Sequence, residues 1–135
     1  MSFGFSISDF IGITGLVARA VHTINSNDLK DEFVVPSQHL TELEDAFRTI
    51  ERVGLDNLEL KEVSMLQQAM DLCQGPIEEL LDFVEKHNSG PGPPVRKRMT
   101  ISEWEKLREG LIATIDEKIM PCKLVIQKLA ANAER

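Results

Sequence analysis

The sequence contains few of the residues from which catalytic and metal sites are usually built. Among 135 residues there are two cysteines, three histidines, one tryptophan and no tyrosine. Two cysteines are too few for a disulfide scaffold or, with so few histidines, for a zinc-finger module. Long apolar runs are also missing, since the uncharged stretch 10–18 is too short to cross a bilayer as a helix.

Basic residues are in the minority, with 15 Lys and Arg against 22 Asp and Glu, for a net charge of −7. Nucleic-acid binding usually needs a basic face, so this balance argues against a nucleic-acid partner. The charge is uneven: residues 1–95 hold 16 acids and 6 bases, whereas residues 96–135 hold 6 acids and 9 bases. Either the two parts pack together and neutralise each other, or the basic part contacts anionic lipid or an acidic partner.

Targeting signals are absent from the N-terminal stretch. No Lys or Arg precedes its first apolar residues, and position 2 is Ser rather than the Gly that myristoylation needs. We therefore expect a cytoplasmic protein in which Cys73 and Cys122 stay reduced. The composition, 42% hydrophobic and 27% charged, is that of a folded domain rather than a disordered tail.

Apolar residues recur at spacings of three and four through most of the chain, which predicts helices and no strands. The expected helices cover residues 8–25, 37–53, 57–87 and 100–133. Their stripes predict an all-α fold, a single domain over 1–135 built as a bundle of four to five helices.

Proline marks the interruptions of this pattern. Pro76 predicts a kink in the long third helix, and Pro121 predicts that the last helix is kinked or divided. The Pro- and Gly-rich segment 88–99 predicts a flexible loop. After it, Ser102 and Glu105 have the spacing of a capping box near the start of the last helix.

Residues that could carry out a reaction are scattered. His22, His39 and His87 lie in separate segments, and none has the spacing of a metal site. Cys73 and Cys122 are expected to be small core residues rather than nucleophiles. The sequence therefore predicts a protein that is not an enzyme, with no cofactor, no metal and no small-molecule substrate.

The first predicted helix has two unlike faces when its residues are placed at 100° per position. One narrow face carries Ser8, Gly12, Gly15, Arg19 and His22. The opposite face carries Phe10, Ile13, Val17, Val21 and Ile24. Two glycines inside a helix cost about 1 kcal/mol each relative to alanine, so we expect some contact to offset that cost.

Two explanations fit this helix. It is either a buried central helix whose glycines let a neighbour approach, or a helix that can leave the bundle and enter a bilayer. The candidate membrane and assembly residues are Phe3, Phe5, Phe10, Ile11, Gly12, Ile13, Gly15, Leu16 and Val17. The candidate contacts to anionic lipid are Arg96, Lys97 and Arg98, whose other interpretation is a solvated charge run.

The opening MSFGFSISDFIG, residues 1–12, resembles the start of the HeLo-like N-terminal domains of fungal STAND (NLR-like) receptors. Two later stretches, Cys73-Gln74-x-x-Ile77 and Trp104-x-Lys106-Leu107, resemble the third and a later helix of that family. The resemblance implies a signalling and programmed cell-death domain in fungal heterokaryon incompatibility and innate immunity. It also implies that the N-terminal helix engages membranes after oligomerisation.

Two hypotheses about function follow. In the first, the chain is a non-enzymatic cell-death effector that forms homo-oligomers and reaches the plasma membrane on activation. The alternative is a protein-interaction or dimerisation module that binds a helical partner domain and never contacts lipid.

The sequence departs from the family pattern at three places: the Pro-rich segment 88–99, Gly75-Pro76 and Pro121.

Overall fold

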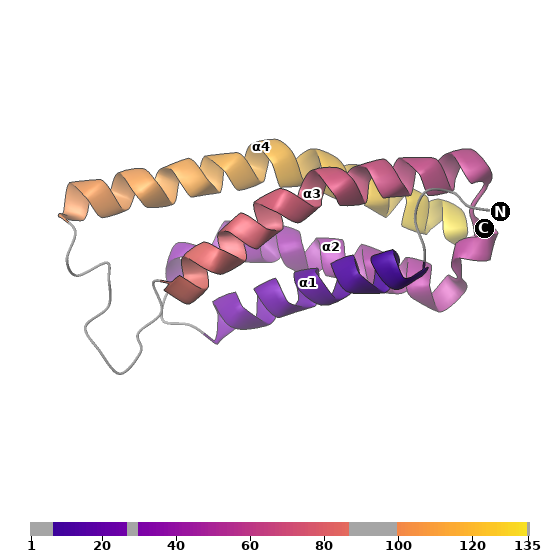
Figure 1. Cartoon of the computed structure of the whole chain (residues 1–135), viewed down its shortest axis with the longest axis horizontal. Helices are drawn as coiled ribbons and strands as arrows, with labels where there is room; N and C mark the ends of the chain where they lie inside the picture. The colour runs from indigo at the N-terminus through magenta and orange to yellow at the C-terminus, as the bar shows by residue number, and fades with distance from the viewer. Residues whose placement is uncertain (1–6, 27–29, 87–99, 135) are drawn as a thin grey trace.

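The computed structural model describes residues 7–26, 30–86 and 100–134 of the chain. Within these ranges the fold is all-α, and the expected helical bundle is confirmed (Figure 1). The elements are α1 (Ile7–Asn25), η1 (Lys30–Glu32), α2 (Val34–Val53), η2 (Leu55–Asn57), α3 (Leu60–Lys86) and α4 (Ile101–Ala133). Residues 1–6 and the expected loop 88–99 lie outside the described part of the chain.

The four helices run side by side along the long axis of the molecule (Figure 1). α4 packs against α3 and α2, whereas α1 packs against α2 and α3. α1 therefore lies on the side of the bundle away from α4. The apolar stripes meet in one core, whose largest fully buried side chains include Phe10, Phe33, Phe47, Leu40, Leu66, Ile77 and Ile115.

α2 begins at Val34, three residues before the expected start at Ser37. Pro36 is buried inside the first turn, where the missing N–H has no partner to lose, so the helix runs through it. Gly54 ends the helix with φ +102°, a backbone conformation that a side chain would oppose. Its N–H donates to the Ile50 carbonyl at 2.8 Å.

α3 and α4 each continue through a proline. Pro76 lies inside α3. This helix changes direction along its length in Figure 1, so the predicted kink in the third helix is confirmed. Pro121 lies inside α4 without dividing it. The carbonyls that lose a donor belong to Leu72 and Glu117, both exposed residues, so water can reach them.

α4 begins where the expected range 100–133 placed it, but its cap differs from the expected one. Thr100 is the N-cap, and its hydroxyl accepts a hydrogen bond from the Glu103 N–H at 3.1 Å. The predicted capping box of Ser102 and Glu105 is therefore wrong, because Ser102 is already inside the helix. α3 likewise begins at Leu60 rather than at Asn57, which belongs to η2.

Candidate functional site

One face of α1 is buried in the core, as its apolar spacing predicted. Phe10 packs edge-on against Phe47 of α2, with ring centroids 5.7 Å apart. The fully or nearly fully buried residues of this face are Phe10, Ile13, Val17, Ala20 and Ile24. Leu16 and Val21 are half-buried and pack beside them. Burial of each large apolar side chain contributes about 1.5–3 kcal/mol, so this face is what holds α1 on the bundle.

The glycine face of α1, defined here by Gly12, Gly15 and the flanking Ile11, is exposed. Ile11 keeps 58% of its surface accessible. A Cβ placed on Gly12 or Gly15 would meet no atom within 4 Å. The expectation that α1 is a central helix, approached closely at its glycines, is therefore wrong within the described residues. No contact there offsets the cost of two glycines inside the helix.

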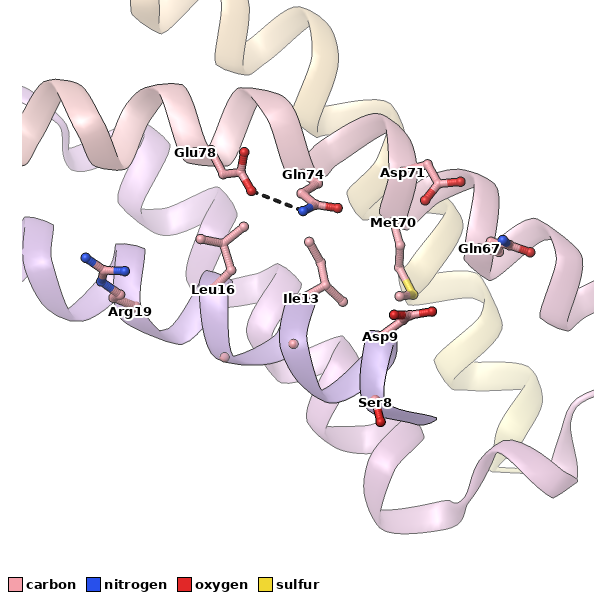
Figure 2. A pocket seen from close by; sticks show the side chains of 12 residues that line it. Ser8, Asp9, Ile13, Leu16, Arg19, Gln67, Met70, Asp71, Gln74 and Glu78 are labelled. Atoms are coloured by element: carbon pink, nitrogen blue, oxygen red, sulfur yellow. Dashed lines mark hydrogen bonds between the residues drawn. The ribbon is translucent and has the colours of Figure 1, made fainter. Parts of the chain in front are cut away.

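The glycine face borders an open groove of about 650 Å³ between α1 and α3. Figure 2 shows Ile13 and Leu16 pointing from α1 toward α3, and Met70 pointing from α3 toward Asp9. These apolar side chains form the floor of the groove. The two helices thus leave between them a concave surface with an apolar base.

The rim of the groove is acidic. Its charged lining residues are Asp9, Asp71, Glu78 and Arg19. The single base among them is engaged, because Arg19 forms an ion pair of 2.8 Å with Glu85 of α3. Gln74 donates a hydrogen bond of 3.0 Å to Glu78, which fixes two rim side chains along α3. The groove therefore presents negative charge around an apolar floor and a glycine-lined edge.

A second cluster of polar groups links α2 and α4. Lys123 is only 5% exposed, and its Nζ donates to Glu42 Oε2 at 2.7 Å. The same Nζ lies 3.1 Å from His39 Nδ1, and His39 Nε2 lies 3.7 Å from Asp116. The hydrogen bond and the positive charge of Lys123 lower the pKa of Glu42 below its ordinary value. No sequence signal pointed to this network, because its members are far apart along the chain.

An aromatic cluster ties the end of α3 to the start of α4. Trp104 stacks on Phe83 with ring centroids 5.5 Å apart, and Phe83 meets Phe33 edge-on at 5.8 Å. The Trp104 indole donates to Glu32. In the sequence, Trp104 was noted only for its resemblance to a family motif, and its two partners, Phe83 and Glu32, come from two other segments of the chain. These contacts position elements of the fold, and Phe83 also lines an open pocket of about 660 Å³ together with Leu107 of α4.

The two cysteines considered as possible nucleophiles lie among core residues. Cys73 and Cys122 are buried, as expected of core residues. In the described ranges no three His, Cys, Asp or Glu side chains converge as metal ligands would. None of the helices placed by the structure combines the length and the apolar character needed to span a bilayer.

Of the predicted site residues, the structure brings Gly12, Ile13, Gly15 and Leu16 to the groove. Phe10 and Val17 are buried away from solvent. Five predicted site residues lie outside the described part of the chain: Phe3, Phe5, Arg96, Lys97 and Arg98.

Comparison of the chain with protein family models, curated proteins and solved structures finds no match. The resemblance to HeLo-like domains thus stays a prediction.

Proposed function

We propose that this chain is a non-enzymatic signalling domain that acts by assembling with further copies of itself through the glycine face of α1. In this proposal, assembly precedes engagement of a membrane by the same helix, as the HeLo-like resemblance of residues 1–12 implies. The biological setting, fungal cell death and immunity, rests on that resemblance alone. The observation that carries the assembly step is the exposed glycine face beside an open groove.

Energetics support a helix as the occupant of that face. Gly12 and Gly15 together weaken α1 by about 2 kcal/mol relative to alanine, and no contact within the described chain offsets this. Glycines let a second helix approach more closely than any other residue would. Burial of Ile11, now 58% exposed, would add about 1–2 kcal/mol to such a contact.

Charge supports a second copy of this chain as the partner. The groove is rimmed by Asp9, Asp71 and Glu78. Residues 96–135 carry 9 bases against 6 acids, and three of those bases are consecutive at 96–98. One copy therefore offers an acidic groove, and another copy offers the three consecutive bases at 96–98. Electrostatic complementarity of this kind steers association and fixes its register.

Membrane engagement requires α1 to leave the bundle. Its five buried apolar side chains contribute several kcal/mol in total, so the helix does not leave without an acceptor for them. A bilayer interface is such an acceptor for an amphipathic helix of this length. The proposal therefore couples release to assembly on a membrane, where the basic residues 96–98 add about 1 kcal/mol each against anionic lipid.

Sedimentation equilibrium tests the assembly step. We expect the wild-type chain to self-associate as its concentration rises, and Gly12→Leu with Gly15→Leu to stay monomeric because the added side chains cover the docking face. Gly110→Leu is the matched control, since Gly110 is also an exposed helical glycine with open space around it. A wild-type chain that is monomeric throughout would contradict the proposal.

Dye release from vesicles that contain anionic lipid separates the two hypotheses about function. The proposal predicts release by wild type and none by the Gly12→Leu, Gly15→Leu chain. Release by both chains would contradict the coupling of membrane engagement to assembly. Self-association without any release would favour the alternative, an interaction module that does not act on lipid.

A further inference from the structure

Buried polar contacts join α4 to both α2 and α3. On the α2 side, Lys123 is only 5% exposed and donates to Glu42 at 2.7 Å. On the α3 side, Glu62 is also 5% exposed, and its Oε2 accepts a hydrogen bond of 2.7 Å from Asn132. Separating either pair would leave a buried charge without its partner, which is costly. These contacts therefore hold α2, α3 and α4 together as one unit.

Two polar contacts of α1 with its neighbours lie instead where water reaches them. Arg19 of α1 and Glu85 of α3 form an ion pair of 2.8 Å, and their side chains are 63% and 44% exposed. At the end of α1, Asn25 accepts a hydrogen bond of 3.1 Å from Ser37 of α2, also at the surface. Water can replace the partner in each contact, so breaking it strands no buried charge.

The packing of α1 against α3 is also interrupted. The groove of about 650 Å³ lies between the two helices. Asp9 of α1 and Asp71 of α3 both line it, so the two helices carry like charges toward one end of the groove. Arg19 lies toward the other end in Figure 2, and its pair with Glu85 is an attraction between the same two helices. Gly12 and Gly15 further weaken α1 as a helix.

We propose that the Arg19–Glu85 ion pair, named here the α1 latch, is an autoinhibitory contact that keeps α1 closed on a unit of α2, α3 and α4. In a local opening the latch breaks and α1 separates, while the other three helices stay folded. The open form is a minor population that assembly captures, a step that rests on the proposed function. Because apparent affinity falls with the fraction of the competent form, the latch weakens assembly of the resting chain.

Hydrogen exchange of backbone amides tests the latch at a concentration where the chain is monomeric. We expect α1 to exchange faster than residues 115–133 of α4, because α1 opens without them. Glu85→Gln removes the charge on α3 and leaves the sequence of α1 unchanged. It should speed exchange in α1 by about two- to fivefold, the effect of losing an exposed ion pair, and leave residues 115–133 unchanged. Unchanged exchange in α1, or equal acceleration in both helices, would overturn the proposal.

Further variants show whether the pair itself is responsible. Glu44→Gln is the matched control, because Glu44 pairs with Arg48 at 2.9 Å within α2 and this pair joins no second helix. Arg19→Gln should speed exchange in α1 as Glu85→Gln does, and the double variant should go no further than Arg19→Gln, since both changes remove one interaction. Faster exchange of α1 in Glu44→Gln, or multiplied effects in the double variant, would overturn the proposal.

Dye release from vesicles that contain anionic lipid separates the latch from the proposed function. If both are right, Glu85→Gln should release dye about two- to fivefold faster than wild type, because more of the chain is open. Faster exchange in α1 without release by either chain would support the latch and contradict the membrane step of the proposed function. Faster exchange with release at the wild-type rate would overturn the autoinhibitory role of the latch.

Discussion

The indole N–H of Trp104 on α4 donates a hydrogen bond of 2.9 Å to the carboxylate of Glu32, in the connection between α1 and α2. This contact joins residues 72 positions apart. It fastens the start of the last helix to the segment that follows the first. The stability of that end of the bundle should therefore depend on both the ring and its hydrogen bond.

Trp104→Phe should remove the hydrogen bond and keep much of the stacking on Phe83. We expect a loss of about 1–2 kcal/mol in the free energy of unfolding, as for a hydrogen bond to a charged group. Trp104→Ala should cost more, about 3 kcal/mol, because the stacked ring is lost as well. Urea denaturation followed by circular dichroism measures both. Equal stability of Trp104→Phe and wild type would show that the hydrogen bond contributes nothing.

Thr100→Ala should destabilise the chain by about 1 kcal/mol, because the Glu103 N–H loses its capping hydroxyl. Ser102→Ala is the matched control, and it should change stability little since Ser102 is inside α4 and exposed. The same denaturation measurement compares them. A larger loss of stability in Ser102→Ala than in Thr100→Ala would mean that Ser102, as the sequence spacing suggested, is the N-cap.

Acid should weaken the bundle through Glu42. Its pKa in the folded protein is lowered, chiefly by the hydrogen bond from Lys123, so its contribution to stability is present above pH 4.5 and is lost as pH falls below that value. Glu42→Gln should therefore be less stable than wild type at pH 7 and lose less stability on acidification. Thermal melts between pH 7 and pH 3 measure this difference.

The control for the acid effect is a substitution of Lys123, the partner of Glu42. Lys123→Met removes the donor on α4, so the chain should show the same reduced sensitivity to acid as Glu42→Gln. The double variant should add nothing further, because both changes remove one interaction. Additive changes in the pH dependence would mean that Glu42 and Lys123 act on stability separately.

Gly12→Ala and Gly15→Ala should each stabilise the isolated monomer by about 1 kcal/mol, since alanine favours the helix and its Cβ meets no atom within 4 Å. Gly110→Ala in α4 should stabilise by a similar amount for the same reason. Thermal denaturation at a concentration where the chain is monomeric measures all three. A destabilised Gly12→Ala would mean that the glycine face is packed after all.

The fold was largely predictable because helical spacing of apolar residues depends on local geometry alone. The apolar face of α1 and its opposite glycine face both follow from 100° per residue. Spacing does not say which neighbour covers a face, and for this reason the exposure of Gly12 and Gly15 was missed. The N-cap was placed wrongly because Thr100 and Ser102 are two hydroxyl residues with an acid three positions later, and local sequence does not choose between them.

Contacts between distant segments could not be predicted. Lys123 and Glu42 are 81 residues apart. The spacing of apolar residues along the sequence does not reveal that a buried lysine pairs with a half-exposed acid. The acidic rim of the groove likewise arises only when α1 and α3 are set side by side.

Self-association of two matched variants distinguishes assembly through the glycine face of α1 from assembly through another surface. Ile11 beside the glycine face and Leu124 on α4 are both 58% exposed, so Ile11→Gln and Leu124→Gln remove the same kind of surface at two places. We predict from sedimentation equilibrium that Ile11→Gln raises the dissociation constant of the assembly by about tenfold or more, as for loss of a buried isoleucine contact, and that Leu124→Gln leaves it unchanged. Equal dissociation constants for Ile11→Gln and wild type would contradict assembly through the glycine face of α1.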